Sequence, residues 1–401
     1  MDWRALWLAP IVAAGIAVSP AAAQATDGVA SPAPALRLDI RNTLDLWRNL
    51  QGGQRRGDTM LDKLQVGVSL DGDRLNRPGF TARAEAFKTN GESFSGSRTG
   101  DLQTASNIEA LGVIRLSQFW AQQQVGSPGN GGLAARVGLL DLNATFDSIG
   151  AAGLFLNSSH GVGPDLSHSG RNGPSIFPVT AAGGQAVWTP TRALTLNAGI
   201  FDGVPGDPSH PRRFAAARLG HGRGALLITQ ADYKFAADAQ ASVGVWGYTA
   251  RSAAISAPGR MLNPRPGAYG FVDVPAPALG PARAWMRVGV ADGRTQTVAG
   301  YLGGGVVWTG LLPRRTEDQL GLAVAHAVIG RNARRSLGLP SAETSLEATY
   351  SVRVSRFLQL QPDLQYIVHP GLAGHVPNAV AAGLRIVATL QQPAGLGGGD
   401  N

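Results

Sequence analysis

The chain has 401 residues, a formal net charge of +8 at pH 7 and no cysteine. Without cysteine it can form no disulfide, thiolate metal site or cysteine nucleophile. Its mean hydropathy of -0.01 excludes a bundle of membrane helices. The same value is compatible with a transmembrane β-barrel, because apolar and polar residues alternate along barrel strands.

The basic excess is almost wholly arginine, since Lys63, Lys88 and Lys234 are the only lysines. The arginines are scattered singly among Gly, Ser and Asn, without the basic runs and aromatic platforms typical of nucleic-acid surfaces. We therefore expect no nucleic-acid partner. Arginine spread over many strands would instead give a tube with a positive interior.

Residues 1–23 have the features of a secretory signal peptide: Arg4 near the start, an apolar run, and small residues at its end. Cleavage is predicted after Ala23, with Ala25 as the alternative, so the mature chain is exported. The apolar run is short for an uncleaved membrane anchor. Residues 24–35 are rich in Ser, Pro and Ala and predict a flexible lead.

From Leu36 onward, about fifteen segments have the length and spacing of strands that cross a membrane at a tilt. Bacterial single-chain barrels have even strand numbers, so one more strand is expected within 147–180 or 251–281. In 133–146 a bulge near Leu139 and Leu140 would keep the apolar residues on one face. The candidate strands are 36–48, 60–71, 78–89, 105–121, 133–146, 181–189, 192–201, 224–235, 239–250, 282–291, 297–309, 317–328, 343–354, 357–369 and 377–390.

Alternation is clearest from Ser345 to Pro370, which predicts a β-hairpin with one apolar and one polar face. In a soluble barrel the apolar face would point inward, whereas in a membrane barrel it faces lipid. The export signal and the alternation of tight and long connections favour a membrane barrel over residues 36–390, with 391–401 as a tail. The residues then expected to line the pore are Glu347, Arg353, Asp363, Gln365, Arg385 and Arg287.

The loop from Leu154 to Pro178 is the richest polar stretch of the chain. It predicts either a loop folded into the lumen or a solvated surface loop, and both interpretations stay open. A metal site is not expected, because His160, Asp165 and His168 would need a further ligand and supporting contacts. The residues that would narrow the pore are Asn157, His160, Asp165, His168, Arg171 and Asn172.

No G-x-S-x-G, H-E-x-x-H or phosphate-binding loop motif occurs, so neither an enzyme nor a cofactor is predicted. A barrel that serves as the scaffold of an enzyme is one alternative, testable by hydrolysis of ester or glycoside substrates. A soluble structural β protein of the periplasm is another, testable by cell fractionation.

Several distinctive motifs follow one another across most of residues 36–390. They are FLNSSHG (155–161), GPSIFP (173–178), GIFDGVPGDP (199–208), GAYGF (267–271), DQLGLAVAHA (318–327), Glu343 and Glu347, LQPDLQYIVHP (360–370) and GLRI (383–386). In type and order these motifs resemble the carbohydrate-selective porins of the OprB type. The resemblance implies a sixteen-stranded barrel in the outer membrane of a Gram-negative bacterium, an arginine-rich constriction with inward loops, and passive diffusion of sugars such as glucose.

Two features depart from the family pattern. Leu390 closes the expected last strand where such barrels usually end on an aromatic residue, and Leu139 stands where the family often has lysine. The expected partners are small sugars and outer-membrane lipid, with the chain as a monomer or a homotrimer. The alternative transport function is a general porin with mild anion preference, because of the arginine excess.

Overall fold

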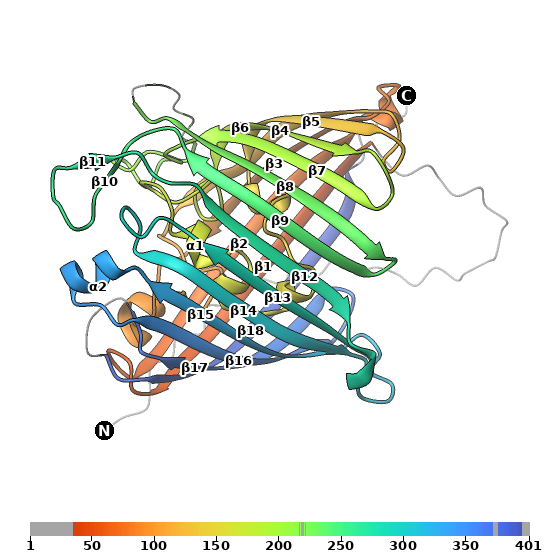
Figure 1. Ribbon diagram of the computed structural model, residues 1–401. Coiled ribbons are helices and arrows are strands. Elements are labelled where there is room, and N and C mark those ends of the chain that lie inside the picture. Colours follow the sequence, from red (N-terminus) through yellow and green to blue (C-terminus); the bar gives the residue numbers. More distant parts are fainter. Residues whose placement is uncertain (1–34, 216, 218–219, 221, 372–375, 395–401) are drawn as a thin grey trace. The chain divides into compact units, whose positions relative to one another are not determined.

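The computed structural model describes residues 35–394, except 216, 218–219, 221 and 372–375. The chain divides into two units, residues 1–33 and residues 34–401. The predicted signal peptide and the predicted lead up to residue 34 lie outside the described residues. Within the described part of the second unit, sixteen antiparallel strands form a closed barrel (Figure 1). The predicted all-β barrel is therefore confirmed.

Each barrel strand pairs with the barrel strand before it in the chain, and β1 closes the barrel by pairing with β18. The strands are β1 (Leu36–Gln51), β2 (Gly57–Asp71), β3 (Phe80–Thr89), β4 (Ile114–Val125), β5 (Gly132–Leu140), β6 (Ala181–Thr189), β7 (Leu194–Asp202), β8 (Ala225–Ala236), β9 (Ala239–Tyr248), β12 (Gly267–Pro275), β13 (Ala282–Val290), β14 (Val298–Thr309), β15 (Gln319–Ile329), β16 (Ala342–Arg353), β17 (Leu358–Val368) and β18 (Ala379–Ala394).

The remaining elements are short and lie in the connections. Among the described residues, no helix is both long enough and apolar enough to span a membrane. These elements are the strand pair β10 (Ser252–Ala253) and β11 (Met261–Leu262), the helices α1 (Pro164–Ser167) and α2 (Arg331–Leu337), the π-helix η2 (Ser95–Thr99), and the 3-10 helices η1 (Gly72–Leu75), η3 (Leu142–Ala144), η4 (Ala151–Leu154), η5 (Ser158–His160) and η6 (Pro277–Leu279).

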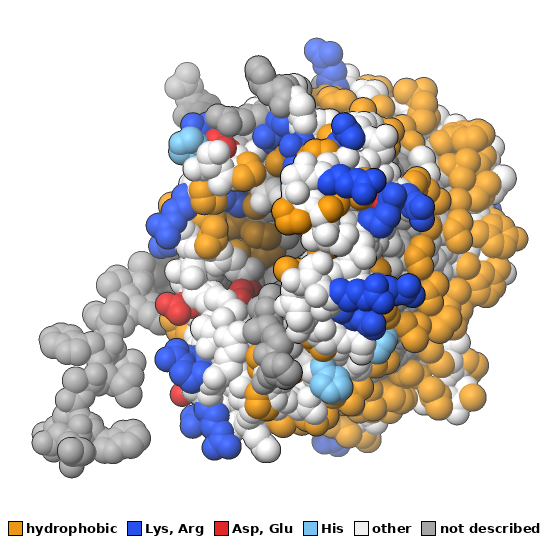
Figure 2. Space-filling view, turned by 60° about the vertical axis from the view of Figure 1, so that its left-hand side comes forward, with side chains coloured by type: hydrophobic (Ala, Val, Ile, Leu, Met, Phe, Trp, Pro, Cys, Tyr) orange, Lys and Arg blue, Asp and Glu red, His pale blue; other side chains and the backbone are white. Residues whose placement is uncertain are grey.

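Side chains alternate between the two faces of the wall, as the sequence predicted for the hairpin from Ser345 to Pro370. Leu346 is 47% exposed on the outer face, whereas its neighbour Glu347 is 3% exposed on the inner face. On β17, Leu364 points outward and Asp363 inward in the same way. Figure 2 shows the resulting apolar outer surface. In a membrane this surface would face lipid while polar groups face the lumen.

The two ends of the barrel differ. One end carries the long connections, such as 90–113 and 141–180, and we call it the long-loop end. The other, the short-turn end, carries tight connections such as 190–193 and 237–238. Figure 2 brings the long-loop end forward and shows it hollowed between the loops. The predicted asymmetry of tight and long connections is thus present.

Two predicted strands need correction, and the additional strand expected from the even strand number can be placed. The extra strand expected in one of two regions is β12, and its Gly- and Pro-rich flanks hid it. The bulge near Leu139 is wrong: β5 ends at Leu140, because Asp141 caps η3 and the chain turns into the barrel. The predicted strand 105–121 begins and ends before the observed one, since β4 begins at Ile114 and ends at Val125. In addition, β18 continues to Ala394, past the expected start of the tail.

An apolar core fills one side of the barrel interior. It joins the connection between β5 and β6 to the inner faces of β7 to β14. From the connection come residues such as Phe146, Phe155 and Leu166, and from the wall residues such as Trp246 and Trp285. This core positions the connection on one side of the lumen. A smaller apolar cluster, which includes Trp47, Leu61 and Ala381 of the wall, packs against Phe94 of the connection 90–113 and covers β18, β1 and β2 toward the long-loop end. Polar side chains line the inner faces of β18, β1, β2 and β3 nearer the short-turn end.

Candidate functional site

Two long connections fold into the barrel. The first inward loop comprises residues 90–113, between β3 and β4, and the second inward loop comprises residues 141–180, between β5 and β6. Gln103 of the first loop donates through Nε2 to the carbonyl of Ala325 on β15 (3.3 Å). The carbonyl of Leu154 in the second loop accepts from Gln361 Nε2 on β17 (2.7 Å). The second loop contains the stretch Leu154–Pro178, and these contacts place it in the lumen.

Two glutamates of β16 hold the loops by their main chain. Glu343 accepts hydrogen bonds from the N–H groups of Leu102 (2.7 Å) and Gln103 (2.8 Å) in the first inward loop. Glu347 accepts from the N–H groups of Leu156 (2.5 Å) and Asn157 (3.1 Å) in the second. The spacing of four residues puts both carboxylates on the inner face of one strand. Four main-chain N–H groups of the two loops thus bind carboxyl groups of one strand, so β16 helps to anchor both loops.

Arg287 of β13 forms a buried three-residue ion cluster with the second inward loop. Its guanidinium donates to both carboxylate oxygens of Asp147 (2.7 and 2.8 Å) and of Asp165 (2.6 and 3.2 Å). The rings of Tyr269 and Tyr301 lie 5.1 and 5.3 Å from the guanidinium carbon. All three charged side chains are at most 2% exposed. The planar fork of arginine suits this pairing with two carboxylates, and it locks the loop to the wall.

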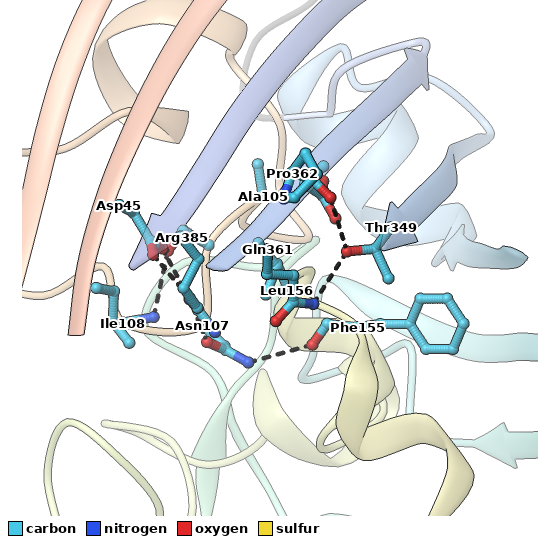
Figure 3. A network of polar contacts seen from close by, with 12 residues as sticks. Asp45, Ala105, Asn107, Ile108, Phe155, Leu156, Thr349, Gln361, Pro362 and Arg385 are labelled. Atoms are coloured by element: carbon cyan, nitrogen blue, oxygen red, sulfur yellow. Dashed lines mark hydrogen bonds and ion pairs between the residues drawn. The ribbon is translucent and has the colours of Figure 1, made fainter. Parts of the chain in front are cut away.

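A second arginine, which lies five strands from Arg287 around the barrel, fastens the first inward loop. Arg385 of β18 pairs with Asp45 of β1 through two hydrogen bonds of 2.7 Å, and it also donates to the side-chain oxygen of Asn107 (2.9 Å). Ser106 donates to the same aspartate (2.6 Å). Figure 3 shows this group beside Gln361, whose side chain reaches the second loop.

Gln365 of β17 links both loops. Its Nε2 donates to the carbonyl of Ala105 (2.9 Å), and its Oε1 accepts from Asn157 Nδ2 (3.3 Å). The same Nε2 donates to the neighbouring Asp363 (3.1 Å). Asp363, Gln365, Glu347 and Arg287 therefore face inward as expected but lie beneath the loops, because the loops cover this part of the wall.

The remaining residues singled out from the sequence are dispersed. His160 is buried between the rings of Phe155 and Trp285, 3.4 Å from Glu347. His168 is exposed. Among the described residues, no group of three or more His, Cys, Asp or Glu could hold a metal ion.

Three predicted residues lie at the ends of the barrel. Arg171 and Asn172 donate to carbonyls of the connection 203–224 at the long-loop end, with distances of 2.6 Å to Gly222 and 2.7 Å to Pro205. Arg353 ends β16 at the short-turn rim and pairs with Glu317 (2.9 Å), where both side chains are 60% exposed. None of the three belongs to the anchoring contacts described above.

A strip of polar side chains follows the inner faces of β1, β2 and β3. Lys63 of β2 lies 4.0 Å from the ring centre of Phe177 in the second inward loop. Arg83 of β3 pairs with Asp39 (2.8 Å) and Glu85 (2.7 Å). Arg41 of β1 is exposed and makes no hydrogen bond or ion pair with another described residue. Cations, carboxylates and an aromatic ring thus share one side of the lumen.

Sequence reasoning missed this strip, although the signal was present. Arg41, Lys63, Arg83 and Glu85 all fall on the inner parity of the segments 36–48, 60–71 and 78–89. The predicted pore residues lie instead on the C-terminal strands β13 to β18, where alternation is cleanest. The polar side chains of those strands do face inward, but they are covered by loops that come from distant parts of the chain.

Comparison with known proteins agrees with this architecture. A segment of 115 residues is 30% identical to Porin B of Pseudomonas aeruginosa, and it covers 24% of this chain and 25% of that protein. The high-pH structure of Pseudomonas putida OprB matches with a TM-score of 0.76 at 19% identity, covering 89% of this chain and 94% of that one. A Rhodopseudomonas blastica porin mutant matches with a TM-score of 0.52 at 10% identity, covering 88% and 100%.

At these identities the two solved structures show the shared fold. The match to Porin B spans only a quarter of that protein's length. The family profile decides the assignment, because residues 55–390 match the carbohydrate-selective porin, OprB family. The chain belongs to the carbohydrate-selective porin, OprB family.

Proposed function

We propose that the protein is an outer-membrane channel through which carbohydrates diffuse passively. The observation that carries this proposal is a closed sixteen-stranded barrel with an apolar outer face and two inward loops that leave one side of the lumen to polar groups. The outward apolar face suits lipid, and closure leaves no strand edge exposed within the membrane. Membership of the family supports sugars as the solutes.

The polar strip supplies the chemistry for sugar passage. Arg83, Lys63 and Gln65 can donate hydrogen bonds to sugar hydroxyls, and Glu85 can accept them. The partly exposed Phe177, whose ring centre lies 5.1 Å from that of the buried Phe87, offers apolar surface for a sugar ring beside these groups. Weak contacts at successive positions let a solute replace its water and still leave.

The inward-facing residues take two roles in this proposal. Glu347, Asp363, Gln365 and Arg287, with Asn157 and Asp165, position the inward loops. The strip on β1 to β3, with Arg385 beside it, contacts the solute. The passage runs through one chain, so this function is available to a monomer and to each subunit of a homotrimer.

Orientation follows from the two ends of the barrel. Outer-membrane barrels have short periplasmic turns and longer external loops. The first residue of β1, Leu36, and the last residue of β18, Ala394, pair with each other at the short-turn end. We therefore propose that the short-turn end faces the periplasm, as expected for a chain exported into a Gram-negative envelope.

Planar-bilayer recording tests the function. Millimolar glucose should reduce the ion current through the purified channel, because a sugar held at the strip obstructs ions. A general porin with mild anion preference would conduct without such block. Catalysis is not part of the proposal, since the family and fold imply a channel.

A further inference from the structure

A polar cavity of about 550 Å³ lies at the short-turn side of the second inward loop. Its roof is formed by Gly150, Ala151, Gly153 and Leu154 of that loop. Its walls carry Arg41 of β1, Arg283 of β13 and Arg385 of β18. The volume is within the range of sites for small molecules. A solute that has passed the inward loops would enter this cavity next, and we call it the short-turn cavity.

The fixed charges of the short-turn cavity leave one cation in excess. Arg283 is paired with Asp273 (2.8 Å), and Arg385 is paired with Asp45 (2.7 Å). Arg41 has no ion-pair or hydrogen-bond partner among the described residues, and its side chain is exposed to the lumen. A charge on a rigid strand that the protein does not neutralise is available to an anionic group of a solute.

Acceptors for hydroxyl groups line the same cavity as this cation. The Nε2 groups of Gln359 and Gln361 donate to Ser351 (2.9 Å) and Leu154 (2.7 Å), which orients both amides. Their side-chain oxygens accept no hydrogen bond from another described residue, and both side chains line the cavity. Thr309 adds a hydroxyl to the same wall. A polyol can donate hydrogen bonds from its hydroxyl groups to these acceptors, whereas a simple anion such as acetate has no hydroxyl group to donate.

The entrance of the barrel has a matching charge. The connections 249–266 and 330–341 at the long-loop end contain Arg251, Arg260, Arg265, Arg331, Arg334 and Arg335 and no Asp or Glu. All six arginine side chains are exposed. Figure 2 shows basic side chains gathered around this end. Such a field raises the local concentration of anions and speeds their capture.

We propose that the channel conducts sugar acids, hydroxylated carboxylates of monosaccharide size, and that Arg41 binds their carboxylate in the short-turn cavity. This inference rests on the proposed channel function. The guanidinium of Arg41 can accept a carboxylate in a bidentate pair, while the amide oxygens of Gln359 and Gln361 accept hydrogen bonds from the hydroxyls. A neutral sugar can still donate its hydroxyl groups to Gln359 and Gln361, but it has no carboxylate to pair with Arg41.

The test is block of ion current in planar bilayers by gluconate, glucose and acetate, each added to the purified full-length mature barrel. Gluconate should half-block the current at about a tenfold lower concentration than glucose, since a charge-assisted pair is added. Acetate should block weakly, because it has the charge and lacks the hydroxyls. Arg41→Gln should bring the half-blocking concentrations of gluconate and glucose together.

Arg353→Gln is the matched control, since it removes one positive charge from the short-turn rim, outside the cavity. It should keep the advantage of gluconate over glucose. Equal block by gluconate and glucose in the unmodified channel would overturn the inference, and so would acetate block as strong as gluconate block. An advantage that persists in Arg41→Gln would also overturn it. Absence of block by all three solutes, with no uptake of glucose into liposomes, would instead overturn the channel function.

Discussion

Replacing Arg287 with Met should detach the second inward loop from the wall. The side chain is 2% exposed and holds Asp147 and Asp165, which are both completely buried. Met has a similar length and no charge, so the substitution leaves two buried carboxylates without their cation. We expect the loop to leave this position so that both carboxylates reach water.

The magnitude follows from the burial of the cluster. Breaking a buried ion pair by removing one partner costs about 3–5 kcal/mol, and here one cation serves two carboxylates. The exposed pair Arg48 and Asp58, with 64% and 67% exposure, provides a control. Arg48→Met should change stability by no more than about 1 kcal/mol, because water screens that pair.

Two assays separate the outcomes. Single-channel conductance should rise in Arg287→Met, because the displaced loop no longer narrows the lumen, and limited proteolysis should cut within 141–180. The triple variant Arg287→Met, Asp147→Asn and Asp165→Asn should recover much of the original conductance, since no buried charge remains unpaired. Unchanged conductance and protease resistance in the single variant would refute the anchoring role of Arg287.

Three further predictions address the wall, the passage and the loops. Leu346→Arg puts a charge on the outer face near the middle of β16 and should lower folding stability in lipid by about 2–4 kcal/mol. Val354→Arg, just past the strand end, should cost about 1 kcal/mol or less. Equal losses of stability in urea titrations of the two variants would show that the faces are assigned wrongly. Lys63→Met should shift the reversal potential in a salt gradient toward cation selectivity, and an unchanged potential would remove Lys63 from the passage. Burial raises the pKa of Asp292, but hydrogen bonds, chiefly from Arg294, outweigh this and lower it from 3.8 to about 2. Because its pKa is lowered, the ionised Asp292 carboxylate stabilises the contact with Arg294 fully above pH 3.8. This stabilisation is lost as the pH falls through about 2 and the carboxylate is protonated. Pepsin cleavage of the connection 291–297 should therefore increase over that interval, and Asp292→Asn should abolish the difference.

The wall of the barrel was largely predictable because its rule is local. Alternation along a strand is set by the geometry of each residue and its neighbours, so Leu346 and Glu347 could be assigned to opposite faces from the sequence. The same rule failed where composition obscured it. The strand β12 was missed because prolines and glycines flank a nine-residue segment.

The site was less predictable because its contacts are distant in the chain. Glu347 binds the N–H of Leu156, which is 191 residues away, and Arg287 binds Asp147 across 140 residues. Parity places Glu347 and Arg287 on the inner face and cannot say that a loop covers them. Arg41 was overlooked for the converse reason, since nothing in its sequence neighbourhood shows that its part of the wall stays uncovered.

The most direct test of the central claim is the entry of sugars into liposomes that contain the purified barrel. Swelling rates should be fast for glucose and fall steeply for larger oligosaccharides, because the inward loops leave passage along only one side of the lumen. Millimolar glucose should reduce the ion current of the same preparation. Swelling no faster than in protein-free liposomes, together with an ion current that glucose does not change, would contradict a sugar channel.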